Sequence, residues 1–196
     1  MKRYILILLL VLFIFSLIFY ENNRINEEKY IEVNKNIIAQ KSFNVSSEST
    51  ELDTSAKGTV FIQENKKVQI VTSIEIDPDD WGGVSVYIPK SWVVSNIISS
   101  YPENEEQSIL VDFVTKWSTG SDKYEWDKYV EIGRGRNYKP TGGGSGTVVI
   151  DLLPDKKVTP DPETFNIMVA VGSNEKEGVK IVGTDYTEIS IPLISD

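Results

Sequence analysis

Three carboxylates crowd one short segment of the chain, Asp77-Pro78-Asp79-Asp80. Carboxylate oxygens are the ligands that calcium prefers, so this segment is a candidate calcium site with Asp77, Asp79 and Asp80 as ligands. The twelve-residue EF-hand spacing is absent, because no bidentate Glu follows at the required distance. Asp and Pro are also common turn residues, since an Asp side chain accepts hydrogen bonds from nearby backbone. An ordinary turn is therefore the alternative interpretation.

Tryptophan supplies a second kind of candidate site. The chain has 4 Trp and 9 Tyr. Trp81, Trp117 and Trp126 fall at the ends of predicted strands or beside loops, where exposed rings could stack on the faces of sugars. Trp92 lies inside an apolar stretch and is expected in the core. The sequence thus predicts glycan stacking by Trp81, Trp117 and Trp126, with packing in the core or at its rim as the alternative.

Missing residue types exclude most familiar catalytic designs. Without Cys there is no disulfide, thiolate nucleophile or cysteine-bound zinc, and without His there is no Ser–His–Asp site or imidazole metal ligand. A pair of carboxylates could still hydrolyse a glycoside. However, 29 acidic residues without a motif identify no particular pair. We therefore expect a protein that is not an enzyme, with no catalytic residue and no cofactor other than calcium.

Two further segments resemble binding motifs. Thr141-Gly-Gly-Gly-Ser-Gly-Thr147 lacks the Lys that a phosphate-binding P-loop needs and leads into a predicted strand, so it is expected to be a flexible loop. Just before it, Arg134, Arg136 and Lys139 form a compact basic cluster. This cluster could bind an anion or an acidic partner surface, and a solvated loop is the alternative.

Net charge restricts the partners. The chain carries 20 basic and 29 acidic residues, a formal charge of −9. Without Lys2 and Arg3, 18 basic residues face 29 acidic ones, a formal charge of −11. Such a charge argues against binding to nucleic acid or to anionic lipid. It suits cations, basic partners or neutral glycans, although solubility alone would also explain it.

The N-terminal sequence predicts a membrane anchor and the side of the membrane on which the rest of the chain lies. Residues 4–20 are almost wholly apolar and, as a helix, would span roughly 25 Å, close to the thickness of a bilayer core. Lys2 and Arg3 precede this run, so residues 1–3 are expected in the cytoplasm and the rest outside the cell. A cleaved signal peptide is the alternative, but no small residues follow the apolar core and no Cys is present for lipid attachment. We therefore predict a single-pass signal anchor at residues 4–20.

Residues 21–57 are predicted to be a polar tether. The spacing of Tyr30, Val33, Ile37 and Ile38 fits a weak amphipathic helix, and residues 42–57 are rich in Ser, Thr, Asn and Glu, as in flexible linkers.

From residue 58 onward, apolar residues recur at every second position. Val68, Ile70, Thr72, Ile74 and Ile76 alternate with more polar residues, as in a half-buried strand. Similar short segments, separated by turn residues, are predicted at 60–62, 84–88, 92–98, 108–117, 125–133, 147–153, 164–171, 179–182 and 186–191. The predicted fold class is an all-β, antiparallel, immunoglobulin-like sandwich of roughly eight or nine strands over residues 58–196.

The segments Asp80–Trp92, Val130–Gly133 and Gly143–Ile150 resemble exported, membrane-anchored β-sandwich proteins of low-GC Gram-positive bacteria, and more loosely immunoglobulin-like and cohesin-like modules. The resemblance covers residues 58–196 and implies an interaction domain at the cell surface, with no site residue carried over. The predicted function is a membrane-anchored extracytoplasmic binding module for an envelope protein or a cell-wall glycan. The alternatives are an accessory or structural subunit of an envelope complex and, last, a carboxylate-based hydrolase.

Overall fold

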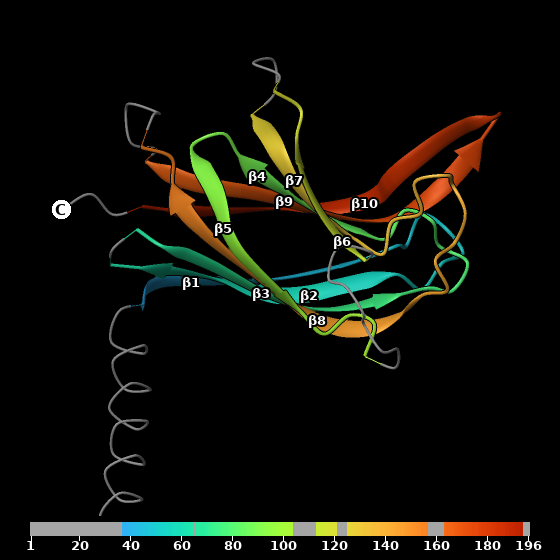
Figure 1. Cartoon of the computed structure of the whole chain (residues 1–196), viewed down its shortest axis with the longest axis horizontal. Helices are drawn as coiled ribbons and strands as arrows, with labels where there is room; N and C mark the ends of the chain where they lie inside the picture. Colours follow the sequence, from blue (N-terminus) through green and yellow to red (C-terminus); the bar gives the residue numbers. More distant parts are fainter. Residues whose placement is uncertain (1–36, 65, 104–112, 121–124, 157–162, 194–196) are drawn as a thin grey trace, which may run out of the picture. The chain divides into compact units, whose positions relative to one another are not determined.

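The computed structural model describes residues 37–64, 66–103, 113–120, 125–156 and 163–193. In this part of the chain ten strands form two five-stranded antiparallel sheets, which Figure 1 shows as two layers. The first sheet has the order β1-β2-β3-β8-β5 and the second the order β10-β9-β4-β7-β6. The strand bounds are β1 (Ile37–Ser46), β2 (Ser55–Gln63), β3 (Val68–Ile76), β4 (Val84–Pro89), β5 (Trp92–Ser99), β6 (Val114–Ser118), β7 (Trp126–Ile132), β8 (Gly144–Pro154), β9 (Thr164–Lys176) and β10 (Val179–Pro192).

The core lies between the two sheets and follows the predicted alternation. In β3, every second residue is buried, from Val68 through Thr72 to Ile76. In the second sheet, β4 and β9 bury the same face, with Val86 and Val169 as directly paired core residues. Each fully buried Val or Ile stabilises the fold by roughly 1.5–3 kcal/mol. The prediction of an all-β antiparallel sandwich is confirmed.

The sandwich begins earlier than predicted, because residues 37–57 contain β1 and the start of β2 instead of a helical and flexible tether. Phe43 and Val45 of β1 are buried, while most other residues of this edge strand are not. Phe43 packs on Gly58 of β2, where an added Cβ would lie 2.6 Å from its ring. The predicted boundary at residue 58 was wrong, since a polar edge strand with two buried residues resembles a linker in sequence.

Three other segments differ from their predictions. The glycine-rich stretch is partly a strand, since Gly144 and Gly146 pair with Ile76 and Ile74 of β3. The two strands predicted at 179–182 and 186–191 form one, β10, with an irregular register between Val182 and Asp185. Of the strand predicted at 108–117, the described part begins at residue 113 and contributes to β6.

The predicted membrane anchor at residues 4–20 and the part of the tether before residue 37 lie outside the described residues. Among the described residues we find no candidate for a membrane-spanning helix.

Candidate functional site

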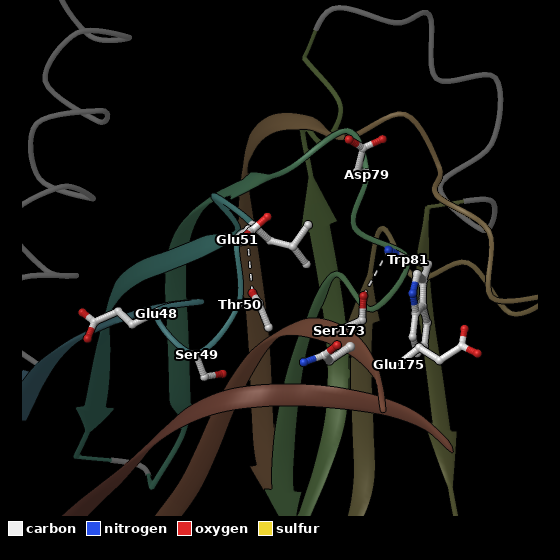
Figure 2. A pocket seen from close by; sticks show the side chains of 10 residues that line it. Glu48, Ser49, Thr50, Glu51, Asp79, Trp81, Ser173 and Glu175 are labelled. Atoms are coloured by element: carbon white, nitrogen blue, oxygen red, sulfur yellow. Dashed lines mark hydrogen bonds between the residues drawn. The ribbon is translucent and has the colours of Figure 1, made fainter. Parts of the chain in front are cut away.

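Three segments that are distant in sequence meet at one end of the sandwich and form a groove of about 630 Å³, here called the end groove. One wall is the turn of residues 48–52, between β1 and β2. Figure 2 shows Glu48, Ser49 and Glu51 on the opposite side of the groove from Trp81 and Glu175. Asp79 and Trp81, both in the loop between β3 and β4, complete the lining together with residues 173–175 of β9.

Hydrogen bonds hold the turn of residues 48–52 in place. Ser47 Oγ donates to the carbonyl of Leu52 at 2.6 Å, and Ser47 N donates to the carbonyl of Thr54 at 2.9 Å. Asp185 of β10 accepts from both the backbone N–H and the hydroxyl of Ser49. The wall of the end groove is therefore fixed to both sheets.

The end groove is acidic. Glu48, Glu51, Asp79 and Glu175 line it, and no Lys or Arg is among its described lining residues. A second groove of about 610 Å³ shares Glu48 and Glu51 and adds Asp53 and Glu75 to the lining. Within the described residues, the side chains of Glu51 and Asp79 have no hydrogen bond or ion pair. Their charges are therefore available to a ligand.

Trp81 brings an aromatic wall with a cation already near it. Its ring meets Tyr138 edge-to-face, with centroids 5.2 Å apart. Lys180 Nζ lies 5.8 Å from the centroid of each ring and pairs with Glu175. An ammonium group over an aromatic face is attracted by the ring quadrupole. The two rings and the Glu175 carboxylate of this wall thus already contact a cation of the same chain, Lys180.

The three predicted calcium ligands have different environments. Asp80 is fully buried and accepts four hydrogen bonds, from the hydroxyls of Thr54 and Ser173 and from the backbone N–H of Gly82 and Gly83. Asp77 accepts from the N–H of Asp53 and of Asp79, in the manner of an Asx turn.

Of the three predicted calcium ligands, only Asp79 keeps a carboxylate without a hydrogen-bond partner in the described part of the chain, and it lines the end groove. In the described part of the chain, no group of three or more acidic side chains is placed to hold a metal ion. The geometry therefore favours the turn interpretation of this segment, and calcium binding stays an untested prediction.

The second candidate region is the outer face of the second sheet. Trp117 of β6, Tyr129 of β7 and Tyr87 of β4 are direct neighbours across adjacent strands, so their side chains lie on the same face. They line a pocket of about 490 Å³, here called the sheet-face pocket, with Ser118, Thr119, Glu131 and Arg134. Trp117 is 41% exposed.

A buried carboxylate lies at the edge of this pocket. Glu131 is only 6% exposed and is bonded by Arg134 and by Arg136, the latter at 2.9 Å. Trp117 Nε1 also donates to Glu131, and the guanidinium carbon of Arg136 lies 3.4 Å from the Trp117 ring centroid. The predicted basic cluster thus serves largely to neutralise a carboxylate of its own chain.

The same surroundings act on Tyr87. Burial raises the pKa of the Tyr87 hydroxyl above its ordinary value of 10.0, and the nearby charge of Glu131 raises it further. The cationic Arg134 acts in the opposite direction. Tyr87 therefore keeps its proton at neutral pH and can donate a hydrogen bond.

The structure separates the three predicted stacking tryptophans. Trp81 lines the end groove and Trp117 lines the sheet-face pocket. Trp126 packs edge-to-face against Tyr87, at 6.4 Å between centroids, and donates to the carbonyl of Asn166 at 3.3 Å. The three rings therefore do not form one platform.

Sequence reasoning did not single out Tyr87, Tyr129 or Glu131. The spacing Glu131-x-x-Arg134-x-Arg136 was a local signal for the ion pairs. The acidic turn at Glu48 and Glu51 carried no signal, because its partners in the groove are distant in sequence.

No protein-family model matches this chain, and no curated protein sequence matches it. A solved structure described as "pH-induced modulation of Streptococcus parasanguinis adhesion by Fap1 fimbriae" is similar at 9% sequence identity and a TM-score of 0.33, over 79% of this chain and 95% of that chain. A similarity at this level carries no argument about function.

Proposed function

We propose that this chain is a membrane-anchored extracytoplasmic binding module whose end groove binds a basic, extended segment of an envelope protein. The observation that carries the proposal is the lining of the groove, which has four carboxylates, one tryptophan and no basic residue among its described members. Lysine and arginine side chains suit both parts of that lining, through ion pairs with carboxylates and through contact with the indole.

The spread of the carboxylates favours a polycation over a single metal ion. A calcium ion needs six to eight oxygens at about 2.3–2.6 Å, which requires clustered ligands. No group of three or more acidic residues in the described part is close enough for that. The second groove continues the acidic surface through Asp53 and Glu75. A ligand with several separated positive charges would match this surface.

The anchor at residues 4–20 is part of the proposal. It would hold the sandwich outside the membrane, so that the partner would be found in the envelope close to that surface. The proposal assigns the chain no catalysis.

The finer fold that we propose is immunoglobulin-like. The order β2-β3-β8-β5 corresponds to the A-B-E-D sheet of immunoglobulin domains, and β10-β9-β4 to G-F-C. β7 then takes the place of the strand that variable-type domains add beside C. One departure is that β5, in the D position, precedes β6 and β7 in the chain.

Titration of the full-length protein in detergent with a lysine-rich peptide tests the partner class. The double substitution Glu51→Gln/Asp79→Asn is expected to weaken binding about three- to tenfold, since each exposed ion pair contributes roughly 0.2–1 kcal/mol. Binding should also weaken as salt is raised. The matched control is Glu163→Gln/Glu188→Gln, which makes the same change in net charge at exposed positions outside the groove. Absence of binding, or equal weakening by both double variants, contradicts the proposal.

An accessory subunit is the second candidate, because the first sheet exposes apolar side chains. Val93 of β5 and Leu153 of β8 are paired neighbours and are 39% and 45% exposed, and Ile98 is 59% exposed. Exposed apolar neighbours such as Val93 and Leu153 are common at protein contact surfaces. A Leu153→Asp variant that still copurifies with the same envelope proteins as the wild type would eliminate this candidate.

A further inference from the structure

The sheet-face pocket has a composition unlike that of the end groove. Three aromatic side chains from three adjacent strands line it, with the hydroxyls of Ser118 and Thr119, the carboxylate of Glu131 and the guanidinium of Arg134. Small-molecule sites typically combine apolar or aromatic walls with a few placed polar groups. The pocket lies on rigid sheet, since β4 and β7 pair along nearly their whole length.

Trp117 is fixed in one orientation. Arg136 covers one face of the ring, with its guanidinium carbon 3.4 Å from the centroid, and Glu131 accepts from the indole N–H. Although held on these two sides, the residue stays 41% exposed. A half-exposed ring that is already held in place loses little conformational entropy when a flat apolar surface stacks on it.

Tyr87 and Tyr129 each bring a hydroxyl group to the lining of the pocket. Within the described residues, neither Tyr87 nor Tyr129 has a hydrogen-bond partner at its hydroxyl. Their rings meet edge-to-face, with an interplanar angle of 89° and centroids 4.9 Å apart. A tyrosine hydroxyl both donates and accepts, which suits the hydroxyl groups of a sugar.

The charges of the pocket favour a neutral ligand. The two charged side chains among the lining residues, Glu131 and Arg134, form an ion pair with each other, so the charges of the described lining sum to zero. The ring pairs recorded in the described part are all edge-to-face, which excludes a flat platform of coplanar rings among them. The site therefore suits one or two sugar rings better than a long, flat polysaccharide surface.

From these observations we infer that the sheet-face pocket binds a neutral pyranose unit of a glycan, with Trp117 as the stacking ring and Tyr87 and Tyr129 as hydrogen-bonding groups. Glu131 is a positioning residue, because it acts through the orientation of Trp117. This site shares no lining residue with the end groove and does not depend on the partner proposed for that groove.

Saturation-transfer NMR and calorimetry on the full-length protein in detergent test the inference, with chitotriose, maltotriose and mannotriose as separate probes. At least one probe is expected to bind saturably. Trp117→Ala should weaken it about tenfold or more, whereas Trp117→Phe should retain part of the affinity because it keeps a ring. Trp81→Ala, in the end groove, is the matched control and should bind like the wild type.

Three results would overturn the inference: no saturable binding of any probe, Trp117→Ala binding like the wild type, or Trp81→Ala weakening binding as much as Trp117→Ala. If Trp117→Ala does not fold, Tyr129→Phe decides, since it removes only a hydroxyl and should weaken binding severalfold, and an unchanged affinity refutes the proposed contact. Binding of the lysine-rich peptide should be the same in Trp117→Ala as in the wild type. The two proposals can therefore fail separately.

Discussion

Replacing Glu131 by Gln changes the charge at the edge of the sheet-face pocket while keeping the shape of the side chain. Glu131 is 6% exposed and accepts from Arg134, from Arg136 and from the indole N–H of Trp117. Gln has one acceptor oxygen, and its amide nitrogen would face a donor. The substitution therefore removes the charge, leaves at least one donor without an acceptor, and leaves two guanidinium groups without their counter-ion.

The cost can be bounded from the burial of the partners. Breaking a fully buried ion pair costs about 3–5 kcal/mol. Here the side chains of Arg134 and Arg136 are 26% and 45% exposed, so water stabilises them once they lose the carboxylate. We therefore expect a smaller loss, about 2 kcal/mol in the free energy of unfolding. For a domain of this size each kcal/mol corresponds to roughly 2–4 °C, so the expected decrease in Tm is about 4–8 °C.

Circular dichroism during heating of the full-length protein measures this decrease. Glu188→Gln is the matched control, because Glu188 is exposed on β10 of the same sheet and its substitution removes the same charge. The control should stay within about 1 °C of the wild type. If the Glu131→Gln protein has the same Tm as the control variant, the two ion pairs do not stabilise the sheet.

Asp80→Asn should lower the free energy of unfolding by about 2–4 kcal/mol in a urea titration, because two of its four donors, one backbone N–H and one hydroxyl, lose their acceptor oxygen in a fully buried site, while Asp79→Asn should be nearly neutral. Phe43→Ala should lower the free energy of unfolding by about 3 kcal/mol, since Phe43 is buried against Gly58. An unchanged denaturation midpoint would show that residues 37–46 do not pack on the sandwich and belong to the tether. The raised pKa of Tyr87 means that the folded protein holds this proton to higher pH than the unfolded chain, so its contribution is complete below the unfolded pKa and is lost as pH rises above it. From about pH 9.5 to 11 the wild type should therefore lose more stability than Tyr87→Phe, and parallel stability curves would refute the burial of that hydroxyl.

The sequence predicted strands best where one face is buried along the whole length. β3 alternates without exception, because each of its inward positions packs against the opposite sheet. β1 was missed because only Phe43 and Val45 of this edge strand are buried, while its other apolar residues, Ile37, Ile38 and Ala39, are not. The strand character of Gly144 and Gly146 was hidden as well. Glycine has no side chain to reveal alternation, and Gly146 is required by the backbone of Tyr101, which would lie 2.6 Å from an added Cβ.

The sites were less predictable than the strands, since they depend on contacts between distant segments. The end groove joins Glu51, Asp79 and Glu175, and no local pattern connects residues so far apart. The exposure of Trp117 could be anticipated from its position at a strand end. Its neighbours Tyr129 and Tyr87 could not, because they depend on the order of β6, β7 and β4 in the sheet. Among the predicted calcium ligands, Asp80 was a chemically reasonable choice that the fold uses for its own hydrogen bonds.

We propose above that a basic polypeptide segment binds in the end groove. Zero-length carbodiimide crosslinking of a lysine-rich peptide to the full-length protein, mapped by mass spectrometry, tests it directly because the reaction joins an amine only to a carboxylate in contact with it. The crosslinks are predicted at Glu48, Glu51 and Asp79, the carboxylates that line the groove without a basic partner in the described part of the chain. Crosslinks spread evenly over exposed acids such as Glu163 and Glu188 would contradict the claim.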